Sequence, residues 1–245
     1  MQIVSIANHK GGVGKTTSAT NIAACWGEAG KRILLVDMDP QGSASMSFGI
    51  TDNGDDLLHA LQRSTGLPVA STQIKDVDMV PSGPNLALAR QLFTGSLGKE
   101  LLLRCIRQTQ GDWDRILIDC PPSLGVLTAT SLWASKHAVI PVETNYLALR
   151  GLNQMVEMVA SIRKDHPGIE ITAIIPCRAH PRRRIHQEIL ERLEELFPGR
   201  VAPAVRENVA LAEAPGLGKP VILYAPRSHG AEDYRNVASW LSKHI

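Results

Sequence analysis

The chain has 245 residues, 44% of them hydrophobic, and a formal net charge of +2. This composition supplies enough apolar side chains for a large buried core. It excludes a strongly basic protein whose overall charge would select a polyanion, and an aromatic content of 4% argues against a stacking surface for single-stranded nucleic acid. The spacing of apolar runs shows no break for a second domain, so we expect a single domain over residues 1–245.

The amino-terminal sequence and the cysteines both indicate in which cellular compartment the protein is expected. Residues 1–5 lead into an apolar run without the basic region or long apolar core of a signal peptide. No apolar run approaches the roughly 20 residues that span a bilayer. Cys25, Cys105, Cys120 and Cys177 form no Cys-x-x-Cys pair, which is typical of a reduced protein with buried thiols. We therefore expect a soluble cytoplasmic protein.

A glycine-rich segment, Lys-Gly-Gly-Val-Gly-Lys-Thr-Thr at residues 10–17, lies between an apolar run at 3–7 and a helix-forming run at 18–29. A strand, a glycine-rich loop and a helix in this order predict a phosphate-binding P-loop. The glycines let the backbone fold around an anion with its N–H groups pointing inward. A helix that begins near Lys15 directs its positive dipole end at the same site. A glycine-rich turn that merely precedes a helix is the alternative, which the strand before it and the Lys-Thr pair after it disfavour.

The expected roles in this loop follow from P-loop chemistry. Lys15 should reach the β- and γ-phosphates, the Thr16 hydroxyl should bind Mg²⁺, and Thr17 should hydrogen-bond the α-phosphate. The other nucleotide contacts of the loop are expected from Gly11, Gly12, Val13 and Gly14.

The start of the loop departs from the common P-loop pattern. His9 occupies the place of the first glycine, and a second lysine, Lys10, follows it. With these residues the segment resembles the deviant Walker A motif of the ParA/MinD family of dimerising ATPases. The resemblance implies that Lys10 reaches across a dimer interface to the nucleotide of the partner, as an arginine finger does, and so couples hydrolysis to dimerisation. The spacing alone indicates only that a second cation is nearby.

The next strand is predicted at residues 32–37, a short apolar run typical of a strand buried on both faces. It ends in the polar segment Asp-Met-Asp-Pro-Gln-Gly at residues 37–42. Ligands in open α/β sheets bind at the carboxyl ends of strands. Asp37 and Asp39 are therefore candidate site residues.

The middle of the chain carries weaker patterns, and residues 43–76 are the least legible. Apolar spacing predicts helices at 55–62, 85–93 and 99–109, and a short strand at 77–80.

Residues 115–122, Arg-Ile-Leu-Ile-Asp-Cys-Pro-Pro, combine a short strand with an acid and a turn. This is the form of a Walker B segment, in which Asp119 would hold Mg²⁺ directly or through water. The alternative is a strand followed by a turn that Asp119 merely caps, and the P-loop earlier in the chain favours the Walker B interpretation.

The remaining elements continue an alternation of strands and helices. Strands are predicted at 138–142 and 169–176, and helices from about Leu149, at 185–197 and at 230–244. The helix at 185–197 is amphipathic, with an expected apolar face of Ile185, Ile189, Leu193, Leu196 and Phe197. At least five strands with intervening helices predict an α/β fold: a mainly parallel, twisted sheet flanked by helices on both faces.

The resemblance extends over nearly the whole chain to the ParA/Soj-type partition ATPases. Residues 37–41 resemble the switch I segment of that family, and residues 119–123 resemble its Walker B and switch II segments. Residues 213–215, 218–220 and 224–228 resemble its carboxyl-terminal signature.

This resemblance implies a slow Mg-dependent ATPase that forms a homodimer with ATP and binds double-stranded DNA without sequence preference. A ParB-like or other adaptor protein would stimulate hydrolysis. The cycle would position a plasmid, a chromosome origin or a protein assembly on the nucleoid.

The resemblance also implies roles for the two acids after the second strand. Asp39 is expected to orient the attacking water, because the family motif places its second acid near the γ-phosphate. A helix cap or a contact with metal-bound water is the alternative for Asp39. Asp37 is expected either to contact metal-bound water or to have a structural role.

Base recognition is expected in residues 205–208. The corresponding family loop reads Ile-Pro-Arg-Asn, and its proline and asparagine border the adenine. Here the loop is Val-Arg-Glu-Asn, so Asn208 is retained and Arg206 replaces the proline. Arg206 is expected to stack on the base, or its presence marks a shifted loop. The preference for ATP over other nucleotides is inferred from the family.

Positive charge is concentrated at residues 178–186, which contain four arginines and two histidines and no acid. The resemblance implies non-specific DNA binding in this region, and phosphate contacts would make that binding steeply salt-dependent. An ordinary solvated basic loop is the alternative. The candidate DNA contacts are Arg178, Arg182, Arg183 and Arg184.

Two other classes share the P-loop. MinD relatives insert a carboxyl-terminal amphipathic helix into membranes, but residues 237–245 are short and weakly basic, so we expect no stable membrane association and assign Trp240 and Leu241 to the core. An iron–sulfur reductase of the nitrogenase iron-protein type would need paired cysteines at a dimer axis, which these cysteines do not obviously provide.

Overall fold

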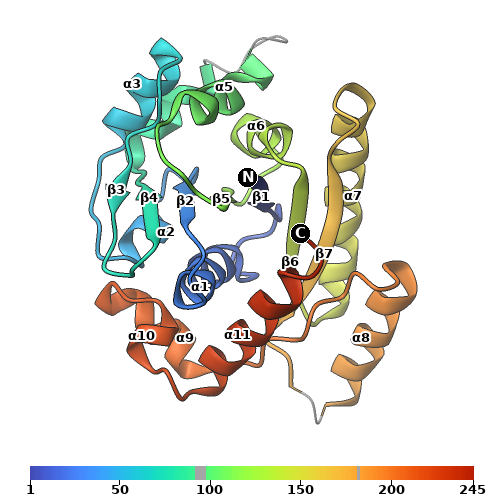
Figure 1. Ribbon diagram of the computed structural model, residues 1–245. Helices are drawn as coiled ribbons and strands as arrows, with labels where there is room; N and C mark the ends of the chain where they lie inside the picture. The colour runs from blue at the N-terminus through green and yellow to red at the C-terminus, as the bar shows by residue number, and fades with distance from the viewer. Residues whose placement is uncertain (92–97, 181–182) are drawn as a thin grey trace.

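The computed structural model describes residues 1–91, 98–180 and 183–245, and within them it contains a seven-stranded sheet with helices on both faces (Figure 1). The strand order is β3-β4-β2-β5-β1-β6-β7. All neighbouring strands pair in parallel except β3 and β4. This arrangement confirms the predicted α/β class. The strands are β1 (Gln2–Ile6), β2 (Ile33–Asp37), β3 (Ala70–Ser71), β4 (Val77–Val80), β5 (Arg115–Asp119), β6 (His137–Glu143) and β7 (Glu170–Cys177).

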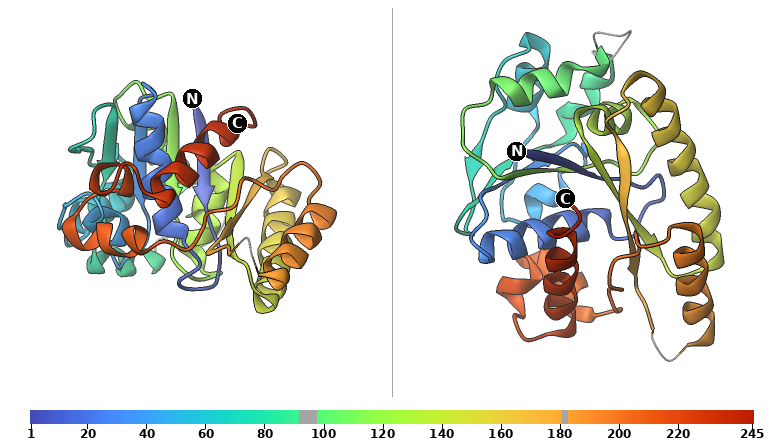
Figure 2. Two further views of the ribbon diagram at one scale, coloured as in Figure 1. Left: turned by 90° about the horizontal axis from the view of Figure 1, so that it is seen from below. Right: turned by 45° about the vertical axis from the view of Figure 1, so that its right-hand side comes forward.

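The helices form two layers, as the views in Figure 2 show. One apolar cluster joins one face of the sheet to α3, α5, α6, α7 and α8. The other joins the opposite face to α1, α2, α10 and α11. The bounds are α1 (Lys15–Glu28), α2 (Ser43–Met46), α3 (Asp55–Arg63), the 3₁₀ helix η1 (Pro84–Gln91), α5 (Leu101–Gln108), α6 (Val126–Ala134), α7 (Tyr146–Asp165), α8 (Arg184–Leu196), α9 (Val209–Glu213), the 3₁₀ helix η2 (Ala214–Leu217), α10 (Val221–Tyr224) and α11 (His229–Leu241).

Two sequence predictions need correction. The helix expected at 85–93 is a 3₁₀ helix that begins at Pro84, and the last two residues of that prediction lie outside the described residues. The apolar face expected for α8 is narrower than predicted, because its Ile185 and Leu196 lie outside the core, whereas Phe197, which follows the helix, is partly buried against the core. Ile189 and Leu193 are buried, whereas Ile185 is 40% and Leu196 46% exposed.

Strand register brings the candidate site together at one edge of the sheet. Asp119 at the end of β5 is the register partner of Ile6 at the end of β1 and of Asp37 at the end of β2. The loop that follows β1 therefore lies beside both acids. Across the described residues, the structure contains no helix with the length and apolar character needed to cross a membrane.

Candidate functional site

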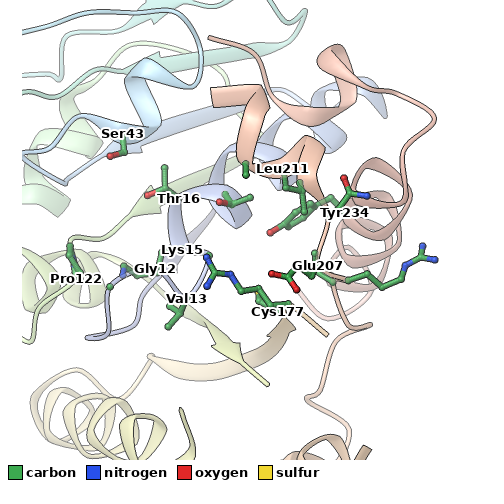
Figure 3. A pocket seen from close by; sticks show the side chains of 18 of the residues that line it. Gly12, Val13, Lys15, Thr16, Ser43, Pro122, Cys177, Glu207, Leu211 and Tyr234 are labelled. Atoms are coloured by element: carbon green, nitrogen blue, oxygen red, sulfur yellow. The ribbon is translucent and has the colours of Figure 1, made fainter. Parts of the chain in front are cut away.

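A cavity of about 460 Å³ opens at the carboxyl ends of the central strands. The P-loop forms its floor, the segment after β2 forms one wall, and residues 205–208 with α9 and Tyr234 of α11 form the opposite wall (Figure 3). A phosphate chain over the P-loop would therefore point its nucleoside toward residues 205–208. We call the P-loop end of the cavity the phosphate side and the end at residues 205–208 the base side.

The P-loop backbone has the conformation that its glycines allow. Gly12 and Gly14 have φ angles of 74° and 96°, in the left-handed region that strains residues with a side chain. A Cβ on Gly14 would also lie 3.3 Å from the Sγ atom of Cys177. Gly14 is the N-cap of α1 and has no side chain to cap the helix, so the first N–H groups of α1 remain available to an anion.

Lys15 is the first residue of α1 and lies across the loop. Its ammonium donates a hydrogen bond to the carbonyl of Lys10 at 2.9 Å, and the residue is 6% exposed. Burial lowers the pKa of Lys15, and the nearby carboxyl groups, Asp119 first and then Asp39, partly oppose that shift. The ammonium is thus held over the loop, where a phosphate would be held.

Asp119 is fully buried, and within the described part of the chain neither of its carboxylate oxygens has a hydrogen bond of ordinary geometry. Burial, and then the charge of Asp37, raises its pKa well above the ordinary value, while the nearby Thr16 hydroxyl and Lys15 lower it. A buried carboxylate without a partner is rare and calls for an ion or a water. An unpaired carboxylate beside a threonine hydroxyl fits Mg²⁺, which prefers oxygen ligands.

Asp37, by contrast, has all of its hydrogen bonds within its own loop. One oxygen accepts from the Ser45 N–H at 2.9 Å and the Ser45 hydroxyl at 2.8 Å, and the other accepts from the Asp39 N–H at 3.0 Å. Burial raises the pKa of Asp37 to about 6 despite these bonds. These contacts shape the segment from Asp39 to Ser45, and a role toward metal-bound water stays a prediction.

Asp39 lines the cavity and is 7% exposed. Its carboxylate accepts the Gln41 N–H at 3.0 Å, and its carbonyl accepts the Ser82 hydroxyl at 2.9 Å. The second contact anchors the loop to the segment after β4, so Asp39 is held at the wall of the cavity. Its predicted role toward water is untested by these contacts.

Lys10 forms an ion pair within its own chain. Its ammonium lies 3.3 Å from one oxygen of Glu143 at the end of β6, and the Arg178 guanidinium lies 3.6 Å from the other. The two cations hold the pKa of Glu143 below its usual value even though partial burial raises it. The predicted contact of Lys10 with a second subunit stays a prediction.

On the base side, Arg206 and Asn208 both line the cavity. The Asn208 side chain accepts the Ala210 N–H at 3.0 Å and so caps α9. The Arg206 guanidinium contacts Asp233 and Glu232 of α11. The structure thus brings both residues to the expected wall, and both already have protein partners.

The basic segment does not act as one surface. Arg178 has a φ of 54° and lines the nucleotide cavity, whereas Arg184 is 91% exposed and lies 3.0 Å from Glu188 on the same helix. Arg183 is the exposed N-cap of α8, and Arg182 lies outside the described residues. DNA contact by these arginines stays a prediction.

Three residues that line the cavity or pair with site residues were missed from the sequence: Glu143, Asp233 and Tyr234. Glu143 follows a predicted strand, so the rule that ligands gather at the carboxyl ends of strands could have found it. The others are brought to the site by packing of the carboxyl-terminal segments, and no sequence pattern predicts that packing. All four cysteines are buried and free, and Cys177 lines the cavity.

Comparison with known proteins agrees with this geometry. Residues 1–171 match a family model described as an AAA domain. The chain is 38% identical over 244 residues to the sporulation initiation inhibitor protein Soj of Bacillus subtilis, covering 97% of this chain and 96% of Soj. It is 35% identical over 249 residues to the chromosome partitioning protein ParA of Myxococcus xanthus, covering 99% of this chain and 88% of that protein.

A solved structure gives the same fold. Cobyrinic acid a,c-diamide synthase from Mycobacterium smegmatis, with bound ADP and magnesium, superposes with a TM-score of 0.82 at 27% identity, over 100% of this chain and 95% of that one. The identity to Soj and ParA extends over nearly the full length of this chain. The chain therefore belongs to the ParA/Soj family of P-loop ATPases.

Proposed function

We propose that this protein hydrolyses Mg-ATP as a homodimer and uses that cycle to position a cargo on nucleoid DNA in the cytoplasm. The observation that carries the proposal is the buried, unpaired carboxylate of Asp119, which lies near Thr16 and Lys15, two residues that line the cavity. A site of this kind suits a metal–triphosphate complex.

The residues at the phosphate side divide the work of hydrolysis. Thr16 and Asp119 would hold Mg²⁺, which when bound neutralises the oxygens of the β- and γ-phosphates. Lys15 adds a fixed positive charge at the same oxygens. Asp39, at the cavity wall, orients the attacking water.

Dimerisation would complete the site. Lys10 is 38% exposed and lies at the rim of the P-loop, in an ion pair that water can reach. Such pairs contribute about 0 to 1 kcal/mol, so Lys10 can leave Glu143 at little cost and contact the triphosphate of a second subunit. Hydrolysis then depends on dimer formation and on a stimulating partner of the ParB or adaptor type.

DNA binding is assigned to the exposed part of the basic segment. Arg183 and Arg184 lie at the beginning of α8, away from the cavity, and a dimer would present two copies to one duplex. Arg178 faces the cavity, so we assign it to the nucleotide side. Phosphate contacts of this kind give affinity without sequence preference and a steep dependence on salt.

The membrane alternative is less well supported. Val237 and Leu241 of α11 are fully buried, and α11 packs against α1. The apolar face that would enter a membrane is therefore already used inside the folded protein.

The test is a titration of non-specific duplex DNA with ATP, ADP and no nucleotide at about 50 and 200 mM salt, beside anionic liposomes. The proposal expects the protein to bind DNA in the presence of ATP but not with ADP or without nucleotide. Its affinity for DNA should fall by orders of magnitude at the higher salt. Binding to liposomes but not to DNA would replace the proposal with a membrane-associated cycle.

Arginine substitutions locate the DNA surface. The double substitution Arg183→Ala and Arg184→Ala should weaken DNA binding and reduce the salt slope by about 1 for each phosphate that is no longer neutralised. Arg192→Ala is the matched control, because Arg192 lies on the same helix with its own partner Glu195 at 2.7 Å. If Arg192→Ala weakened DNA binding as much as the double substitution, the DNA-binding surface would have to lie elsewhere on the protein.

A further inference from the structure

One edge of the base-side wall, residues 205–208, is hydrogen-bonded to β7 and to the segment that follows it. The Val205 N–H donates to the carbonyl of Pro176 at 2.8 Å, and the Val205 carbonyl accepts the Ala179 N–H at 3.0 Å. The Glu207 N–H donates to the carbonyl of Ala179 at 3.3 Å. N–H groups alternate in direction along an extended segment, so the N–H of Arg206 points away from β7.

Asp233 of α11 binds this remaining N–H and the side chain of the same residue. Its carboxylate accepts the Arg206 N–H at 2.9 Å and two guanidinium nitrogens, Nε at 2.9 Å and a terminal nitrogen at 2.6 Å. Glu232 accepts the same terminal nitrogen at 2.8 Å. Asp233 is 5% exposed, so the carboxylate end of this forked, charge-assisted contact is shielded from water, while the Arg206 side chain is 32% exposed.

Helix α11 also contacts the phosphate side of the cavity. The residue after Asp233 is Tyr234, whose hydroxyl lies 3.1 Å from the hydroxyl of Ser18, one turn into α1 from Lys15. Figure 3 shows Tyr234 in the cavity with Lys15 and Glu207. One turn of α11 therefore connects the base wall to the helix that carries the P-loop lysine.

From these contacts we infer that Arg206 and Asp233 are positioning residues for the nucleotide. They hold the base-side wall at a set distance from the P-loop, and the Arg206 guanidinium supports the wall from behind instead of stacking on the base. Asp233 thereby contributes to ATP affinity without touching ATP. The inference concerns nucleotide binding alone and does not depend on DNA binding or on a partner protein.

Two probes separate the base side from the phosphate side: Mg-ATP, and Mg-tripolyphosphate, which has no base. Their dissociation constants are measured by titration calorimetry for wild type, Arg206→Gln, Asp233→Asn and the double variant. Each single change should weaken ATP binding about tenfold, the scale of coupling between contacting residues, and leave tripolyphosphate binding unchanged. The double variant should be no weaker than either single one, because both changes break the same contact.

A second ion pair on α11 provides the matched control. Arg235 makes a forked contact with Glu28 of α1, with N···O distances of 2.7 and 2.9 Å, and neither residue lines the cavity. Arg235→Gln should lower the melting temperature by no more than Asp233→Asn does, because its ion pair is more exposed, while both dissociation constants stay at their wild-type values. Arg206→Lys keeps the charge but loses the fork and should recover part of the ATP affinity.

Three results would overturn the inference. A loss of ATP affinity in Arg206→Gln with none in Asp233→Asn would mean that Arg206 contacts the base directly. Equal losses for ATP and tripolyphosphate would mean general damage to the fold. Additive losses in the double variant would mean that the two residues act separately.

Discussion

Asp119 and Asp37 are register partners at the ends of neighbouring strands, and both carboxylates are fully buried. Asp37 has hydrogen bonds from Ser45 and Asp39, whereas Asp119 has none of ordinary geometry in the described structure. Burial raises the pKa of Asp119, and the charge of Asp37 raises it further. The nucleotide-free protein thus carries an electrostatic cost that a bound cation would remove.

Replacing Asp119 with Asn should stabilise the nucleotide-free protein and impair its function. The change removes a buried charge, so at pH 8 we expect the melting temperature to rise by about 4 °C, as for a gain of 1 to 2 kcal/mol. Mg²⁺ should no longer strengthen ATP binding in this variant. Scanning calorimetry and ATP titrations with and without Mg²⁺ measure both effects, and Asp112→Asn, at an exposed acid, is the control. A destabilised Asp119→Asn protein would contradict this account of the site.

Stability without nucleotide should fall as pH rises through the region in which Asp37 ionises. The folded protein keeps a proton on Asp37 up to about pH 6, whereas the unfolded chain loses it near 3.8. The folded state therefore binds more protons in that window, and its stability decreases with rising pH by about 3 kcal/mol from this group. Urea unfolding of wild type and Asp37→Asn at pH 4 and pH 7.5 measures the difference. Parallel pH profiles for the two proteins would rule out this shift.

Replacing Asp39 with Ala should stop hydrolysis and preserve the ATP-bound dimer. If Asp39 orients the attacking water, we expect phosphate release to fall by at least about 100-fold. Light scattering after size-exclusion chromatography with Mg-ATP should show a persistent dimer. Asp39→Asn keeps an acceptor for the Gln41 N–H and so separates the charge of Asp39 from its contact within the loop. A monomeric Asp39→Ala protein with ATP would contradict the assignment.

Replacing Lys10 with Ala should prevent the ATP-dependent dimer while each monomer still binds ATP. Glu143→Gln should have the opposite effect, because it removes the partner that holds Lys10 within its own chain. Since that ion pair is partly exposed and each dimer frees two such lysines, the protein concentration needed for dimerisation should drop by no more than about 30-fold. Lys75→Ala, at a side chain that is 92% exposed, is the control. Undisturbed dimerisation of Lys10→Ala would remove Lys10 from the interface.

Local sequence determined the elements that carry the phosphate side. The P-loop, α1 and the strands before Asp37 and Asp119 lie within a residue or so of their predicted bounds. These elements are specified by short-range signals: buried apolar runs of strand length, and glycines where the backbone needs positive φ. The short helices α9 and α10 have only four or five residues, too few to show the 3.6-residue signal. Helix α6 has no charged residue and its hydroxyl-bearing residues are buried, so it has no polar face to mark the period.

The partners of the charged residues were decided by tertiary structure. Lys10 meets Glu143 from 133 positions away and Arg206 meets Asp233 from 27 positions away, and the basic segment divides where the backbone turns at Arg178. Residue type and order limit which groups can bind a nucleotide. Strand register and helix packing decide which charges meet, because an ion pair depends on distance in space and not on separation along the chain.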